Sequence, residues 1–73
     1  MNREILYTNP EVGDLVTLKS YCRNSGKMAI VTEILSYTTE KVKIHYFEPD
    51  DKGDIGGVAA VVNLLRWEDK DKG

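Results

Sequence analysis

The apolar residues of this chain fall in short runs, and the clearest run alternates strictly with polar residues. In KVKIHYF, residues 41–47, valine, isoleucine and tyrosine take one set of alternate positions, while two lysines and a histidine take the other. A period of two is typical of a β-strand that buries one face. Pro49 is expected to end this strand, because proline has no backbone N–H to donate into a central ladder.

Four further segments complete the predicted set of strands. LVTL at 15–18 is short, and MAIVTEIL at 28–35 is largely apolar on both alternating sets, which predicts a bulge or bend within it. VAAVV at 58–62 is the fourth strand, and 63–65 is expected to form one helical turn before a last short strand that contains Trp67. These runs are rich in β-branched residues and bounded by turn residues. The sequence therefore predicts an all-β protein, a small five-stranded antiparallel barrel.

The length and the cysteine count limit the kinds of protein this can be. Seventy-three residues make one domain, whose stability we expect to be on the order of 3–5 kcal/mol. We divide it into an extension over 1–10, a barrel over 11–67 and a charged tail over 68–73. Cys22 is the only cysteine and His45 the only histidine, so one chain cannot form a disulfide or a Cys/His zinc site. We expect neither a metal nor a cofactor.

The charge and the N-terminus give a second set of expectations. Ten basic and twelve acidic residues leave a net charge of −2, which argues against a protein whose whole surface binds nucleic acid. The N-terminus lacks a basic segment followed by an apolar run, and no apolar stretch approaches the roughly 20 residues of a membrane span. We expect a soluble, cytoplasmic protein with no membrane partner.

Four short motifs carry a resemblance to a known class of fold. These motifs are VGDLV at 12–16, GKMAIV at 26–31, VKIHY at 42–46 and VNLL at 62–65. Through them the chain resembles the SH3-like barrels. More narrowly, it resembles the KOW- and Tudor-like modules and the short phage proteins that begin with a V-G-D-x-V strand. The resemblance covers about residues 11–67. It implies binding rather than catalysis, in a structural or host-directed phage protein that would then be associated with the virion.

The resemblance does not extend to the peptide-binding SH3 domains. That group has an acidic, aromatic-rich first loop and a pair of tryptophans along a proline-binding groove. Here the first loop is basic, and the single tryptophan, Trp67, lies near the C-terminus. Proline-rich peptides are therefore not the expected ligands.

The stretch HYFEPDDKGD at 45–54 gathers the histidine and four carboxylates, which makes it a candidate site. An EF-hand calcium loop needs a glutamate at its twelfth position, and twelve residues from Asp50 the chain has Val61. We expect His45 to be a solvated surface residue. The acidic residues fit a hairpin turn in which Gly53, Gly56 and Gly57 supply positive φ angles.

Nucleophilic catalysis is not favoured either. Cys22 lies in a basic loop that would make a thiol more reactive, and His45 could approach it across the barrel. No nucleophile elbow, phosphate-binding glycine loop or metalloprotease motif is present. We favour a half-buried structural thiol, and we expect no enzyme and no small-molecule substrate.

The charge distribution suggests two classes of partner. Nucleic acid is one, bound by a basic loop and strand that comprise Lys19, Tyr21, Arg23, Lys27, Lys41 and Lys43. The other, which we favour, is a protein or a second copy of the chain, with contact residues among Tyr37, Phe47, Asp50, Asp51, Asp54 and Trp67. A basic end and an acidic end would suit head-to-tail assembly. The simpler explanation of the lysines is that they protect an outer strand face from edge pairing.

Overall fold

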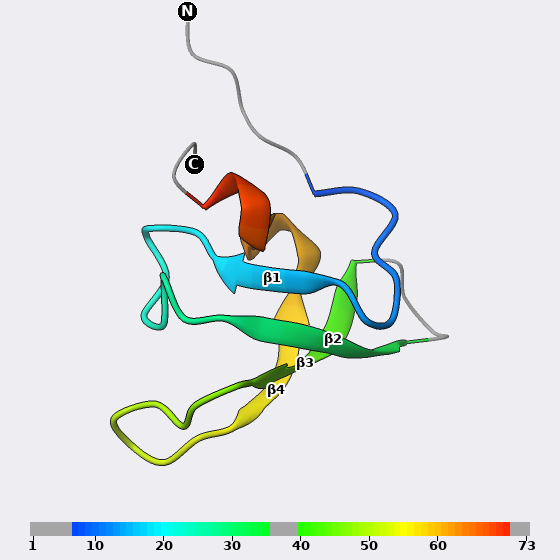
Figure 1. Ribbon diagram of the computed structural model, residues 1–73. Coiled ribbons are helices and arrows are strands. Elements are labelled where there is room, and N and C mark those ends of the chain that lie inside the picture. The colour runs from blue at the N-terminus through cyan, green and yellow to red at the C-terminus, as the bar shows by residue number, and fades with distance from the viewer. Residues whose placement is uncertain (1–6, 36–39, 71–73) are drawn as a thin grey trace, which may run out of the picture.

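The computed structural model describes residues 7–35 and 40–70, and these residues form an all-β domain (Figure 1). Loops and one single-turn 3-10 helix join five strands, and a second single-turn 3-10 helix follows the last strand; the all-β class is as predicted. In chain order the elements are β1 (Leu15–Leu18), β2 (Ala29–Ile34), β3 (Lys41–Tyr46), β4 (Gly56–Ala60), η1 (Val61–Asn63), β5 (Leu64–Arg66) and η2 (Trp67–Asp69).

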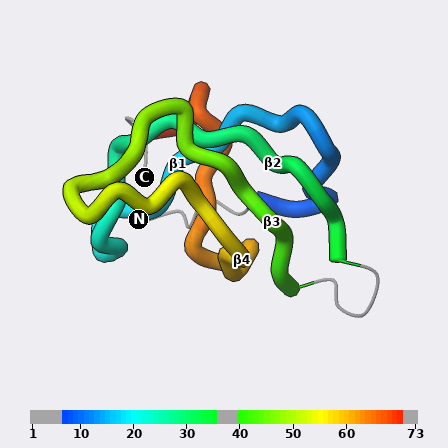
Figure 2. The backbone as a smooth tube through the Cα atoms, turned by 90° about the horizontal axis from the view of Figure 1, so that it is seen from below, coloured from blue at the N-terminus to red at the C-terminus, as the bar shows by residue number. Residues whose placement is uncertain are grey.

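All five strands belong to one antiparallel sheet with the order β4-β3-β2-β1-β5. The sheet is curled rather than flat, with β4 at a steep angle to β1 (Figures 1 and 2). The predicted barrel is not closed, because within 7–35 and 40–70 no ladder joins the edge strands β4 and β5. The turn η1 redirects the chain after β4, and all three residues of β5 pair with β1 instead.

The alternating pattern of β3 is confirmed and sets the position of the core. Val42, Ile44 and Tyr46 are buried, whereas Lys41, Lys43 and His45 are exposed on the opposite face. Pairing with β3 brings buried residues of β2 onto the same inner face. Val61 of η1 and Leu64 of β5 also pack there. The core cluster consists of Tyr7, Val16, Ala29, Val31, Val42, Ile44, Tyr46, Val61 and Leu64.

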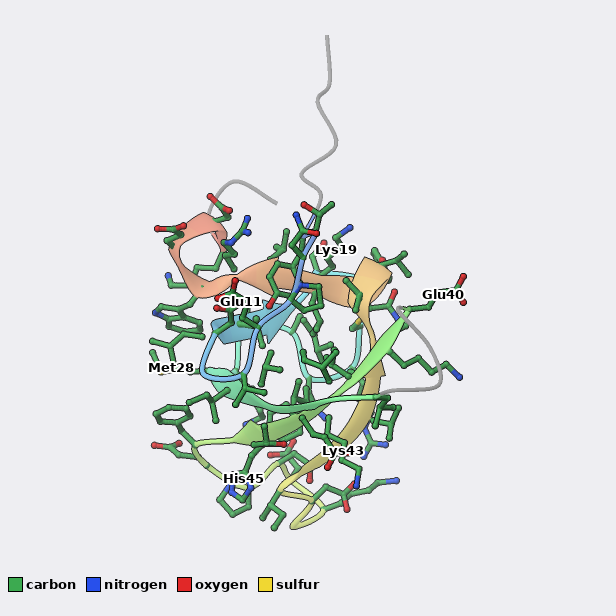
Figure 3. All side chains as sticks on the ribbon, turned by 90° about the vertical axis from the view of Figure 1, so that its right-hand side faces the viewer. Glu11, Lys19, Met28, Glu40, Lys43 and His45 are labelled. Carbon is green, nitrogen blue, oxygen red and sulfur yellow. The ribbon has the colours of Figure 1, made fainter. Side chains whose placement is uncertain are left out.

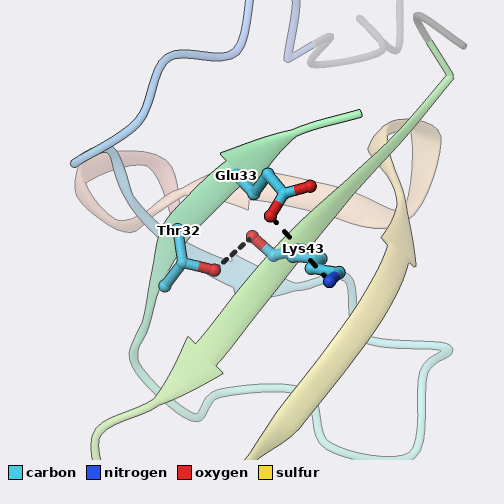
Figure 4. A network of polar contacts seen from close by, with 3 residues as sticks. All are labelled: Thr32, Glu33 and Lys43. Atoms are coloured by element: carbon cyan, nitrogen blue, oxygen red, sulfur yellow. Dashed lines mark hydrogen bonds and ion pairs between the residues drawn. The ribbon is translucent and has the colours of Figure 1, made fainter. Parts of the chain in front are cut away.

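The bulge predicted within the second strand is present in β2. The register with β3 shifts between Val31 and Glu33, which leaves Thr32 as the extra residue. The hydroxyl of Thr32 donates to the carbonyl oxygen of Lys43 at 3.3 Å, and the ammonium group of Lys43 lies 3.9 Å from Glu33 Oε1 (Figure 4). The bulge explains how an apolar run can be buried at Val31 and exposed at the positions that follow.

Tyr7 belongs to the core, although the predicted barrel began at residue 11. Its side chain is buried, its hydroxyl donates to Asp14 Oδ2 at 2.6 Å, and the guanidinium carbon of Arg66 lies 5.2 Å from its ring centroid. Burial, and then the hydrogen bond and the negative charge of Asp14, raise the pKa of Tyr7 well above its ordinary value. The segment before β1 therefore folds back onto the sheet.

The C-terminal end of the fold differs in detail from the prediction. The helical turn expected at 63–65 lies at η1, and Trp67 is not in the last strand but begins η2. The last strand stops at Arg66, and Lys70 caps η2 with its ammonium group 5.2 Å from the Trp67 ring centroid. Over the described ranges, the chain forms no helix with the length and apolar character needed to cross a membrane.

Gly56 is the residue at which the pairing of β3 with β4 most strictly requires glycine. Its φ is +139°, and a Cβ atom there would overlap the carbonyl oxygen of Ile44 and lie 2.9 Å from His45 Cα. We expect Gly56→Ala to lower the free energy of unfolding by about 3 kcal/mol, because backbone strain and overlap with β3 add. Gly57→Ala is the control: its φ is +155°, its Cβ would meet open space, and its cost should be about 1 kcal/mol. Urea unfolding of the two variants measures the difference, and equal losses would contradict this account.

Thr17 is a position at which a substitution should stabilise the fold. It is 2% exposed, pairs with Leu65 of β5, and its hydroxyl oxygen makes no hydrogen bond within the described part of the chain. We expect Thr17→Val to raise the free energy of unfolding by about 1 kcal/mol, because it replaces a desolvated hydroxyl with a methyl group of the same shape. Thr32→Val is the matched control, since that exposed hydroxyl has a partner in Lys43. A destabilised Thr17→Val in chemical denaturation would show that Oγ1 is satisfied in solution.

Candidate functional site

The basic loop after β1 and the acidic loop after β3 lie at the same end of the domain. The amide nitrogen of Asn24 in the first loop donates to Asp50 Oδ2 in the second at 3.3 Å, and to the hydroxyl of Tyr46 at 3.2 Å. The backbone N–H of Phe47 donates to the carbonyl oxygen of Met28, which joins the loops again. The prediction of opposite basic and acidic ends is therefore wrong, because the β2–β3 pairing places the two loops side by side.

Asp50 shapes the acidic loop from within rather than facing a partner. The residue is 8% exposed, and Oδ1 accepts the backbone N–H groups of Lys52 at 2.8 Å and Asp54 at 2.9 Å. The hydrogen bond from the Asp54 N–H is the main cause that holds the pKa of Asp50 below its usual range, although burial acts in the opposite direction. The Lys52 N–H, the Asn24 amide and the positive charge of Arg23 lower this pKa further. Asp51 and Asp54 remain exposed.

A groove of about 300 Å³ runs along the whole of β4, and we call it the seam groove. All five residues of β4 line one side, and Ile44 and Tyr46 of β3 line its floor. Among the described lining residues, Asp54 is the one that carries a charge. The opposite side consists of Leu18, Cys22, Asn24 and Asn63. The seam groove thus occupies the open side of the sheet, between β4 and the loop that follows β1.

Two of the residues across the seam groove from β4 are fixed by hydrogen bonds. Asn24 is held by its bonds to Tyr46 and Asp50. Asn63 Oδ1 accepts from the hydroxyl of Tyr21 at 2.9 Å, and its carbonyl oxygen accepts from the Lys19 N–H at 2.8 Å. These contacts hold the far wall, and pairing with β3 holds the β4 wall, so the groove is preformed in the absence of a ligand.

The backbone of β4 presents unpaired groups to the seam groove. Hydrogen bonds join Tyr46 to Ile55 and Val61 to Glu40 at the two ends of the β3–β4 ladder. Because such bonds recur at every second residue of an antiparallel pair, Gly57 and Ala59 also direct their backbone groups toward β3. The N–H groups of Gly56, Val58 and Ala60 therefore point away from β3, where the described sheet has no further strand.

Large exposed apolar side chains surround this edge. Val58 lines the groove and is 53% exposed, while Ile55 and Val62 flank β4 on either side and are also exposed. Tyr21 lies across from them, with its ring exposed and its hydroxyl near Asn63 and the Val62 carbonyl oxygen. An uncharged edge strand with an apolar rim is a surface suited to pairing with another strand.

The structure does not bring the cysteine and the histidine together. Cys22 is half-buried and lines the seam groove, whereas His45 is exposed on the outer face of β3 (Figure 3). Since Ile44 and Tyr46 of the same strand point into the groove, the sheet itself separates the two side chains. Within residues 7–35 and 40–70, no group of three or more His, Cys, Asp or Glu side chains is placed to hold a metal ion.

The six residues of the predicted nucleic-acid surface are spread over the molecule. Lys19 and Lys43 lie on opposite sides of it in Figure 3. Lys43 faces Glu33, and Lys27 shares a groove of about 410 Å³ with Glu48. Tyr21 and Arg23 are exposed in the first loop, and Lys41 is exposed on β3. The set therefore includes acidic neighbours and does not form one continuous basic face.

The aromatic residues predicted to contact a protein are likewise separated. Phe47 is 57% exposed beside Met28 and Lys27, whereas Trp67 is half-buried in a different groove beside Leu15 and Arg66. Tyr37 lies outside the described residues. Neither Phe47 nor Trp67 lines the seam groove.

The sequence carries one signal for the seam groove, which is the absence of charge around β4. The longest stretch of the chain without a charged residue runs from Ile55 to Leu65 and includes all of β4. Edge strands are usually protected by charges or proline, so an uncharged edge is informative. The sequence alone does not show that this strand lies at an edge.

Comparison with known proteins adds no relative: no family profile, curated protein or solved structure matches the chain.

The role of Asp50 predicts a specific pH dependence. Because its pKa is lower in the folded chain than the ordinary value of about 4, its charge stabilises the fold above that pH, and this contribution is lost as the pH falls through the folded value. We expect Asp50→Asn to be less stable than the wild type at neutral pH, with the difference shrinking below about pH 4. Asp51→Asn, at the exposed neighbour, should leave the midpoint unchanged. Thermal unfolding across pH tests this, and a pH-independent difference for Asp50→Asn would contradict it.

Proposed function

We propose that this chain is a non-enzymatic binding module of the SH3-like barrel class that binds protein through the seam groove. The observation that carries the proposal is the coincidence of the groove with the unpaired, uncharged edge of β4. Such an edge offers backbone donors and acceptors in an extended row, which another extended segment can satisfy by adding a strand. The side chains of Asn24 and Asn63 then supply polar contacts from the far wall.

The strand order supports the SH3-like assignment. An SH3-like barrel runs its five strands in the order found here, with the first strand paired to the last, and a 3-10 turn links the fourth strand to the fifth. The V-G-D-x-V motif leads into β1, with Gly13 at φ +96° and the Asp14 carboxylate accepting from Tyr7 and Glu11. These features agree with the sequence resemblance over residues 11–67.

Protein binding is better supported than nucleic-acid binding. A nucleic-acid surface needs positive side chains gathered along one path. Here Lys43 has an acidic partner, Arg23 acts on the Asp50 carboxylate, and Lys19 lies on the other side of the molecule. The seam groove, by contrast, combines apolar rim residues with unpaired backbone groups, a combination that suits an extended peptide.

A peptide selection with amide mapping tests the proposal. Short random peptides are displayed and selected on the wild-type chain, and the amide chemical shifts of the chain are followed as each selected peptide is added. We expect shifts at β4 and on the opposite wall at Leu18, Cys22 and Asn24, because the added strand lies between them. Selection of no peptide, or shifts confined to the outer face at Lys41, Lys43 and His45, would contradict the proposal.

A parallel titration with single- and double-stranded oligonucleotides addresses the alternative. Nucleic-acid binding would shift the amides of the basic residues and weaken steeply as salt is added, because phosphate contacts release counterions. It would also be lost in Arg23→Glu. We expect no shift at low salt. Salt-sensitive shifts at the basic positions together with a failed peptide selection would replace the protein-binding function with nucleic-acid binding.

A further inference from the structure

We propose that the ligand of the seam groove is β4 of a second copy of this chain, so that two domains join edge to edge in a continuous sheet. The inference rests on the proposed function, since it names the partner of the same groove. Its basis is the geometry of β4: an edge strand with outward backbone groups, no charge and an exposed valine at its centre.

One symmetric register uses every outward group of β4. A strand that pairs with its own copy about a two-fold axis places one residue opposite itself, and its outward residues must face outward residues of the copy. All three outward residues of β4 find such a partner only when Val58, at the middle of the strand, lies on the axis. Centring on Val58 puts Gly56 of one copy opposite Ala60 of the other, so that the outward residues face one another in pairs. No residue of β4 is forced out of register.

Side chains are compatible with this arrangement. Val58 lies on the outer face of the sheet beside Lys43, its partner in β3, so the two valines would meet as a cross-strand pair on that face. Gly56 has no side chain to obstruct the approach, and Ala60 has a single methyl group. The uncharged stretch ensures that no like charges are opposed at the centre of the interface.

Charge complementarity at the ends of the strand favours a second copy as the occupant. Asp54 lies just before β4, whereas exposed Lys41 is the β3 partner of Ala60 at the other end of the strand. An antiparallel two-fold pairing brings the start of one β4 to the end of the other. The acidic end of each copy therefore meets the basic end of its partner, twice in the dimer.

The opposite edge of the sheet is less suitable for such pairing. β5 has three residues, one of which is Arg66, and the chain continues from it directly into η2. A charged and very short edge strand is a usual protection against strand addition. The two edges thus differ, and only β4 combines length, absence of charge and a groove beside it.

Ala60→Pro separates edge pairing from folding. Ala60 has φ −73° and ψ 132°, which proline can adopt, and its N–H points away from β3, so the variant loses no bond of the β3–β4 ladder. It does lose a donor at the outer edge. We expect it to unfold at nearly the wild-type denaturant concentration and to dimerise at least about tenfold more weakly.

A charge variant provides a second, independent change. Val58→Lys would place two ammonium groups opposite each other at the two-fold axis, and we expect it to weaken dimerisation about tenfold. Val12→Lys is the matched control, because it makes the same substitution at an exposed valine before β1, away from β4. That variant should dimerise like the wild type.

The measurement combines sedimentation equilibrium from about 10 μM to about 1 mM with amide hydrogen exchange at both ends of that range. We expect the mass to rise toward a dimer, and the amides of Gly56, Val58 and Ala60 to become protected only at high concentration. A wild type that stays monomeric throughout would overturn the inference. Dimerisation that leaves these amides unprotected would also overturn it, because another surface would then be responsible. The same conclusion would follow if Val58→Lys and Ala60→Pro dimerised as strongly as the wild type.

The peptide selection distinguishes failure of this inference from failure of the proposed function. A monomeric chain whose β4 amides become protected when a selected, unrelated peptide is added would overturn self-pairing but retain the binding module. A monomeric chain that also binds no peptide along β4 would overturn both.

Discussion

The hydrogen-bond ladders on both sides of β3 are the interaction on which the rest of this fold depends. β3 pairs along its length with β2 and with β4, and its alternating side chains decide which face of both neighbours is buried. A slip of one residue in β3 would expose Val42, Ile44 and Tyr46 together. In a domain of this size the loss would remove a third of the core cluster, so the register of this strand is strongly specified.

The same ladders determine where the two charged loops meet and where the sheet ends. Because β2 begins opposite the end of β3, the loop before β2 and the loop after β3 must be neighbours, and Asn24 can reach Asp50. Because β4 pairs with β3 on one side and the chain then turns at η1, the other side of β4 is left open. The candidate site is therefore a product of topology and not of a motif.

This origin explains how far the sequence could predict the structure. The strand at 41–46, the bulge near Thr32 and the acidic turn with Gly53 follow from local patterns, as the sequence predicts. The fourth strand, predicted at 58–62, instead spans Gly56–Ala60, because Gly56 and Gly57 pair with β3 rather than belonging to the turn. The closed barrel and the strand containing Trp67 were wrong, because the end of a short strand is set by what the next residues pack against. The burial of Asp50 and the role of β4 as an edge depend on contacts between distant residues, and no local pattern encodes them.

The double hydrogen bond of Asn24 has a mechanical consequence. One side-chain amide connects the first loop both to the core, through Tyr46, and to the second loop, through Asp50. The two loops are thus latched to each other at a point that also lines the seam groove. A ligand that drew this amide toward itself would release both loops in one event, so occupancy of the groove and the stiffness of the whole loop end are coupled through a single nitrogen atom.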